Sequence, residues 1–171
     1  MIASSLPTTI YVLDTSSIIE FKASVVPAAN QWNVFKALEE MVARGEIAVC
    51  KQVFSELTRI THTDVAGAWA HGVKPQCRYL EVEDDWVTYV LDEVPDLVDW
   101  NKQNEDADPW VVAQACELRE VGNQVFVVTC DQKDHPGNLS IVSACNRLQL
   151  VDLEPKEFLI RVGLSKLAGI E

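Results

Sequence analysis

The sequence has few basic residues for its length. It holds 14 Lys and Arg against 26 Asp and Glu, a formal net charge of −12. This balance counts against a general nucleic-acid-binding surface, which needs an excess of positive charge. The excess of negative charge is mostly local, because residues 81–108 contain eleven acids and a single base, Lys102. This stretch is most simply a solvated helical face, and the alternative is that part of it lines a cation site or mimics a nucleic-acid surface.

Other scarce features narrow the class of protein. Seven Gly and seven Pro exclude a collagen-like or low-complexity chain, and a hydrophobic fraction of 48% argues against disorder. No apolar run reaches the roughly 20 residues that a membrane helix needs. The first residues lack the basic and apolar segments of a signal peptide. We therefore expect one globular domain that does not contact a membrane.

Cysteine and histidine give no sign of a zinc site. The five Cys form no Cys-x-x-Cys or Cys/His spacing, and the three His do not cluster. Most of the Cys are expected to be buried thiols in a reducing compartment, which predicts a cytoplasmic location.

Short apolar runs alternate with helical patterns along the chain. Strands are expected at residues 10–14, 46–50, 124–131 and 148–153. Helices are expected from 15, over 27–45, 51–60, 63–72, within 84–100, over 108–121, around 141–148 and over 155–168. This alternation predicts an α/β fold, a three-layer α/β/α sandwich with a mostly parallel central sheet. We expect a single domain over 1–171, with its core at about 10–151 and a C-terminal helix at 155–168.

Two of the predicted strands end in an acid, Asp14 after Ile-Tyr-Val-Leu and Asp131 after Val-Phe-Val-Val-Thr-Cys. If these strands are parallel neighbours, both carboxylates emerge at the same edge of the sheet, where such folds bind ligands. Glu56 lies in the helix after the second strand, and Asp108 begins the helix before the third. Four carboxylates at one edge would favour Mg²⁺ or Mn²⁺. Such ions could activate water for attack on a phosphodiester.

Each of these acids also has an ordinary structural interpretation. Asp14 could cap the following helix, and Asp108 could be an N-cap with Pro109 at the first helical position. Glu56 could be a solvated residue on a helix surface. Asp131 could belong only to a turn. The order and context of all four, rather than any one of them, favour a site.

Three segments resemble the motifs of PIN domains. YVLDTSSIIE, 11–20, resembles the opening motif, a strand-end Asp followed by Thr and a small polar residue. ADPWVVAQACEL, 107–118, resembles the third motif, and VFVVTCDQKD, 125–134, resembles the fourth. Glu56 in VFSELTRI stands where the helical Glu of the family is expected. The resemblance spans roughly residues 10–151 and is closest to compact bacterial PIN proteins, including VapC-type toxins.

The resemblance implies a Mg²⁺- or Mn²⁺-dependent endoribonuclease, the toxin of a toxin–antitoxin pair, with an antitoxin protein as partner. Carried over by position, Asp14, Glu56, Asp108 and Asp131 would form the catalytic and metal-binding site. Thr15, Ser16 and Thr129 would orient the carboxylates or a metal-bound water. Asp134 would be an extra metal ligand, whereas Asp106 is expected to be a solvated loop acid.

The sequence departs from this pattern in two respects. Ser16 stands where many relatives have Asn, and the acidic stretch 81–105 is poor for binding RNA. A non-catalytic PIN-like module that binds proteins is therefore the alternative function. Family relatives commonly pair through helices, and a face with Trp32 and Phe35 is the candidate surface for a homodimer.

Two other phosphate or metal sites that begin with a strand-end Asp do not match. Haloacid-dehalogenase-type phosphatases need a second Asp two residues later, where this chain has Ser16. A von Willebrand-type adhesion site needs Asp-x-Ser-x-Ser, and Ile18 stands at the last position.

Overall fold

A computed structural model describes residues 8–60, 64–103 and 106–170 of the chain. The start of the chain, and residue 63, where a helix is expected to begin, lie outside these ranges. Four strands form one sheet in the order β2-β1-β3-β4, and every neighbouring pair is parallel. The strands are β1 Thr9–Leu13, β2 Ile47–Ala48, β3 Gln124–Val128 and β4 Val151–Leu153. The predicted parallel sheet is confirmed.

Helices fill most of the remaining chain. The α-helices are α1 Thr15–Glu20, α2 Ala28–Arg44, α3 Lys51–Ile60, α4 Val65–Val73, α5 Asp84–Glu93, α6 Asp108–Glu120, α7 Ile141–Arg147, α8 Pro155–Arg161 and α9 Ser165–Ala168. A π-helical segment, η1 Phe21–Val25, continues α1, and 3-10 turns occur at η2 Lys74–Gln76 and η3 Pro95–Leu97. None of the helices in the described ranges has the length and apolar character needed to cross a membrane.

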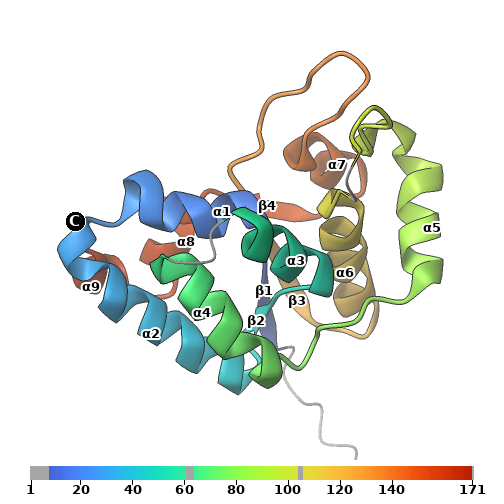
Figure 1. The fold of residues 1–171 in the computed structure, drawn as a ribbon. Helices are drawn as coiled ribbons and strands as arrows, with labels where there is room; N and C mark the ends of the chain where they lie inside the picture. The colour runs from blue at the N-terminus through green and yellow to red at the C-terminus, as the bar shows by residue number, and fades with distance from the viewer. Residues whose placement is uncertain (1–7, 61–63, 104–105, 171) are drawn as a thin grey trace, which may run out of the picture.

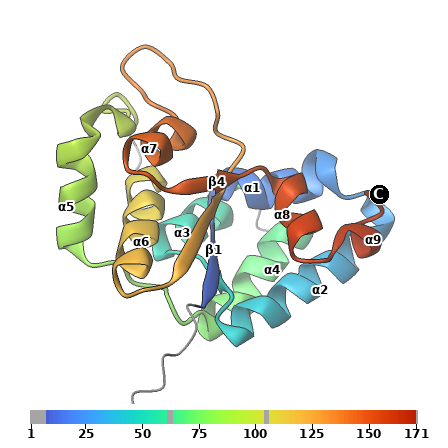
Figure 2. The ribbon, with the colours of Figure 1, turned by 180° about the vertical axis from the view of Figure 1, so that it is seen from behind.

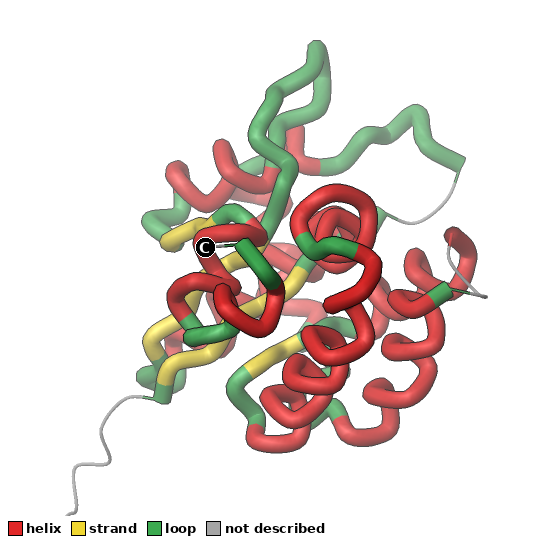
Figure 3. Tube along the Cα trace, turned by 90° about the vertical axis from the view of Figure 1, so that its left-hand side faces the viewer, coloured by secondary structure: helices red, strands yellow, loops and turns green. Residues whose placement is uncertain are grey.

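The sheet is covered on both faces, which confirms the three-layer α/β/α sandwich. On one face the ring of Tyr11 in β1 stacks on Phe126 in β3 and meets Phe158 of α8 edge-on, with centroids 5.6 and 5.0 Å apart. Figures 1 and 2, which are opposite views, place α6 on the other side of β1 from α8. The side view in Figure 3 shows the strands, in yellow, running between the helices.

Two elements differ from the sequence-based expectation. The strand expected at 46–50 is reduced to two residues, because β2 is an edge strand that pairs only with β1. The single helix expected at 155–168 is two helices, α8 and α9. The break contains Gly163, whose φ of 77° is a left-handed conformation that glycine adopts without strain.

The carboxyl ends of the two central strands meet at one edge. Leu13 is in register with Val128, and the N–H of Asp14 donates to the carbonyl of Val128 at 3.2 Å. The sheet thus brings the first residue after β1 next to the end of β3. The helix α1 starts at this edge, and the loop from β3 to α7, orange in Figure 1, extends from it.

Candidate functional site

A cleft of about 600 Å³ lies at this edge of the sheet. It is lined by residues from α1, α3, the start of α6 and the loops after β1 and β3. Its lining residues are Asp14, Thr15, Ser16, Ile19, Glu56, Lys102, Asp106, Asp108, Cys130, Asp131, His135 and Asn138. The four carboxylates that the sequence predicts to gather therefore share one cleft.

Asp14 is the most buried of these acids, with 3% of its surface exposed. Its Oδ1 accepts the N–H of Ser17 at 2.8 Å, which caps α1, and its Oδ2 accepts the Thr129 hydroxyl at 2.7 Å. The hydroxyl of Ser16 donates to the same carboxylate. Burial raises the pKa of Asp14 to about 6, although these three donors lower it. Capping and lining the cleft are thus both roles of Asp14.

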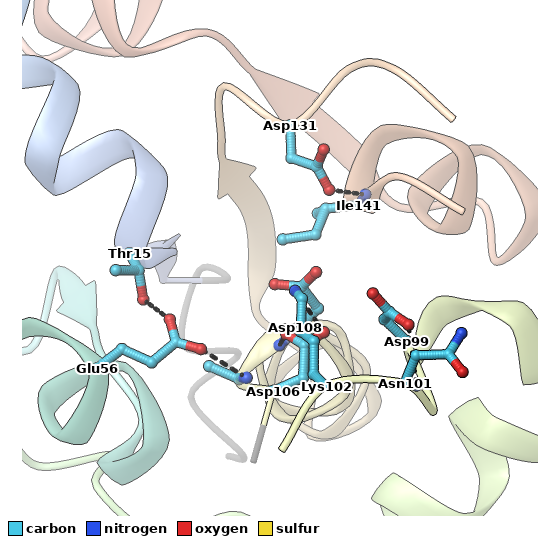
Figure 4. A network of polar contacts seen from close by, with 10 residues as sticks. Thr15, Glu56, Asp99, Asn101, Lys102, Asp106, Asp108, Asp131 and Ile141 are labelled. Carbon is cyan, nitrogen blue, oxygen red and sulfur yellow. Dashed lines mark hydrogen bonds and ion pairs between the residues drawn. The ribbon is translucent and has the colours of Figure 1, made fainter. Parts of the chain in front are cut away.

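Glu56 connects the starts of two helices, rather than pointing into solvent. It accepts the hydroxyl of Thr15, at the start of α1, with one carboxylate oxygen. Its other oxygen accepts the N–H of Ala107, immediately before α6, at 3.0 Å. Figure 4 shows the Glu56 carboxylate between these two donors. The amphipathic helix α3 delivers the side chain from a position 41 residues after Thr15 and 51 before Ala107.

Asp108 is the first residue of α6, and the N-cap position belongs to Ala107. The N-cap of α6, expected at Asp108, therefore lies one residue earlier in the structure. Its N–H donates to Asp106 at 3.3 Å, and Asp106 also receives the ammonium of Lys102 at 3.2 Å. Within the described residues, no hydrogen bond or ion pair reaches the carboxylate of Asp108.

Asp131 reaches the cleft from a loop, because β3 ends at Val128 rather than at residue 131. Its Oδ2 accepts the N–H of Ile141 at 2.9 Å, which ties the loop to the start of α7. Asp134 does not line the cleft. It is exposed, and its Oδ1 accepts the N–H of Ser140 and the hydroxyl of Ser143 at 2.9 and 2.7 Å.

The cleft has a surplus of negative charge. Desolvation, followed by repulsion from Asp106, Asp14, Asp131 and Glu56, raises the pKa of Asp108 far above its usual range. These four acids and Asp108 all line the same cleft. Lys102 is the one Lys or Arg among the described lining residues, and Asp106 already pairs with it. A bound cation would offset this surplus.

The donor set fits Mg²⁺ or Mn²⁺ in chemistry and in charge, since it consists of carboxylate and hydroxyl oxygens. Among the described residues, no three His, Cys, Asp or Glu side chains already form a group able to hold a metal. Several carboxylate oxygens instead accept protein hydrogen bonds. Mg²⁺ keeps most of its waters and usually takes only one or two carboxylates directly. In the described part of the chain, the carboxylate of Asp108 and the Oδ1 of Asp131 accept no hydrogen bond. These two groups are therefore the best candidates for direct metal ligands.

Sequence reasoning missed part of this site. Asp106, expected to be a solvated loop acid, is only 8% exposed and lines the cleft with Lys102. His135 and Asn138 line it from the loop between β3 and α7. The sequence signal for Asp106 was its place two residues before Asp108, in Asp-Ala-Asp-Pro. No sequence pattern marks His135 and Asn138, since both lie in a loop.

Residues 11–165 match the model of a family described as a domain of unknown function, DUF4411. A search of curated proteins finds no match. The matched range includes every residue that lines the cleft.

Proposed function

Since the chain belongs to the DUF4411 family, whose description gives no function, we propose its function from the cleft: it is a Mg²⁺- or Mn²⁺-dependent endoribonuclease with a PIN-like fold. The observation that carries the proposal is the convergence of Asp14, Glu56, Asp108 and Asp131 on one cleft at the carboxyl edge of a parallel sheet. Ligands of such sheets bind at this edge.

The protein's own residues can supply positioning and charge. Asp108 and Asp131 would hold the cation directly, and Asp14 and Glu56 would bind its waters. The bound ion would activate a water and stabilise the charge that develops on the phosphate. Ser16 and Thr129 fix the carboxylate of Asp14, and Thr15 fixes that of Glu56. These contacts keep the acids from rotating away from the cleft, which preserves the geometry between reactions.

A toxin role follows from the resemblance to VapC-type PIN proteins, and we propose it together with a cytoplasmic location and an antitoxin that blocks the cleft. We also propose a homodimer whose interface contains Trp32 but not Phe35. Trp32 is 71% exposed on α2, whereas Phe35 is buried against Phe21 and Trp69 and cannot form part of an exposed face.

The test is cleavage of a labelled single-stranded RNA by the purified protein with Mn²⁺. We expect cleavage that stops with a chelator and resumes when Mn²⁺ is added back. Asp108→Asn should lower the rate at least roughly 100-fold, the upper end of what losing an outer-shell partner of a metal costs. Asp134→Asn is the matched control, because Asp134 is an exposed acid outside the cleft.

Chelator-resistant cleavage, or equal loss in Asp108→Asn and Asp134→Asn, contradicts the nuclease proposal. The alternative function, a non-catalytic module that binds proteins, predicts no cleavage by any variant while the fold stays intact by circular dichroism.

A further inference from the structure

A short turn beside the cleft carries a large exposed aromatic side chain. In the turn from Asp99 to Lys102 the N–H of Lys102 donates to the carbonyl of Asp99 at 3.0 Å, and Asp99 Oδ1 accepts the N–H of Asn101. Trp100, inside this turn, is 76% exposed. An isolated exposed Trp is ordinary on a protein surface. Trp100 differs from such a residue in that Lys102, two residues further along the same turn, lines the cleft.

The same turn supplies the positive charge of the cleft. Lys102 lines the cleft, and its ammonium lies 3.2 Å from Asp106. About half of the Lys102 side chain is exposed, so the ammonium can also meet a ligand from solvent. Two residues of chain span at most about 7 Å, which places the backbone of Trp100 within one nucleotide's reach of Lys102. Figure 4 shows this turn, at Asp99 and Asn101, beside Asp106 and Asp108.

We propose that the turn 99–102 is the substrate-binding element of the cleft: Trp100 stacks on an unpaired base and Lys102 holds an adjacent phosphate of single-stranded RNA. The inference rests on the proposed ribonuclease function, whose substrate class it names. An exposed indole accepts any unstacked base, and an ammonium accepts a phosphate. Paired bases in a duplex present no free face to the indole, so double-stranded RNA cannot use this element.

Because the surroundings of the turn are acidic, base stacking should contribute more to RNA affinity than phosphate contacts do. Asp99 and Asp106 flank Lys102, and residues 81–108 carry ten acids besides Asp108. This part of the surface therefore offers a phosphate chain one favourable contact instead of a basic track. We expect weak salt dependence, with one single-strand phosphate contact contributing about 0.7 to the slope of log K against log salt.

The experiment measures binding of a labelled 12-nucleotide single-stranded RNA by fluorescence anisotropy, with Ca²⁺ present, and cleavage of the same RNA with Mn²⁺. Trp100→Ala should weaken binding roughly 30-fold, which is the middle of the range for one stacked base. Lys102→Gln should lower the salt slope by about 0.7. Both should raise KM and leave kcat unchanged. Circular dichroism checks that both variants stay folded, since Lys102→Gln removes the ion-pair partner of the buried Asp106.

The controls are Tyr89→Ala and Lys36→Gln, which change an exposed aromatic residue on α5 and an exposed lysine on α2, both outside the cleft. These should bind RNA as the unmodified chain does. The inference is overturned if Trp100→Ala and Tyr89→Ala bind equally well, or if a duplex binds as tightly as the single strand. If the RNA is bound through Trp100 and Lys102 but never cut, the inference stands and the ribonuclease proposal fails.

Discussion

At Asp14 a single carboxylate both caps a helix and lines the cleft. Its burial is unfavourable for the charged form, and three donors offset that cost. Thr129, the residue after β3, is one of these donors, and its hydroxyl also accepts the N–H of Asp131 at 3.0 Å. Thr129 thus joins two of the proposed metal-binding acids through one oxygen atom.

Thr129→Val tests this arrangement. Valine keeps the shape of the side chain and removes the hydroxyl, which takes one of three donors from the Asp14 carboxylate and leaves the Asp131 N–H without its acceptor. We expect a Mn²⁺ dissociation constant about 10–100-fold higher, the usual cost of losing an outer-shell partner. The free energy of unfolding should fall by about 1–3 kcal/mol, the cost of a buried unpaired group. Calorimetric titration and urea unfolding measure the two quantities.

Thr88→Val is the control, since Thr88 is exposed on α5 and does not line the cleft. Unchanged Mn²⁺ affinity in Thr129→Val would show that Asp14 does not need this hydroxyl to take part in the site.

Among the elements, α4 has the clearest electrostatic anchor. Asp64 caps it by accepting the N–H of Gly67 at 3.0 Å, and Asp64 also pairs with Lys22 of η1. Burial alone would raise the pKa of Asp64, but the hydrogen bonds and the charge of Lys22 lower it below 3.8. A carboxylate with a lowered folded-state pKa stabilises the fold above its unfolded pKa. It loses that contribution as the pH falls through the folded value.

Asp64→Asn isolates this charge, because asparagine is an equally good N-cap. At pH 7 the variant should be less stable by about 0.2–1 kcal/mol, the range for a partly exposed ion pair. The difference should shrink below about pH 4, where the Asp64 of the unmodified chain becomes protonated. Urea unfolding at pH 7, 5 and 3 measures it, and Lys22→Met should show the same trend. A difference that stays constant from pH 7 to 3 would mean that the charge of Asp64 does not contribute.

The hydrophobic pattern of the sequence predicts which helices and strands form better than it predicts where each one ends. The helix expected at 51–60 is observed over those residues, because Val53, Leu57 and their spacing mark one buried stripe. The strand expected to end at 131 stops at Val128, since its neighbours β1 and β4 end there and no further partner continues the ladder. Strand ends depend on pairing, which is a tertiary property.

In the candidate site, too, some features follow from the sequence and others depend on tertiary packing. Strand order brings Asp14 beside the end of β3, and a parallel sheet predicts this from the sequence. The hydrogen bond from Ala107 to Glu56 joins groups 51 residues apart and depends on how α3 packs near α6. The burial of Asp106 depends on its pairing with Lys102. The first contact is long-range and no local pattern encodes it. The second joins residues four apart, but in a loop, where that spacing does not set whether the side chains meet.

For the molecule as a whole, the net charge of −12 is an unusual starting point for a protein that acts on RNA. The fold places part of that charge in one cleft, where a divalent cation would neutralise it, and places one lysine and one exposed tryptophan beside it. In this account, RNA binds through the cation and through stacking instead of through a basic surface.

The central claim is that the acids of the cleft bind a divalent cation together. Calorimetric titration of the metal-free protein with Mn²⁺ tests it most directly, with Asp108→Asn and the control Asp134→Asn titrated alongside. The account predicts saturable binding by the unmodified chain and by Asp134→Asn, and a dissociation constant at least roughly 100-fold higher in Asp108→Asn. Absence of Mn²⁺ binding by the folded, unmodified chain, or equal affinity in all three proteins, would contradict it.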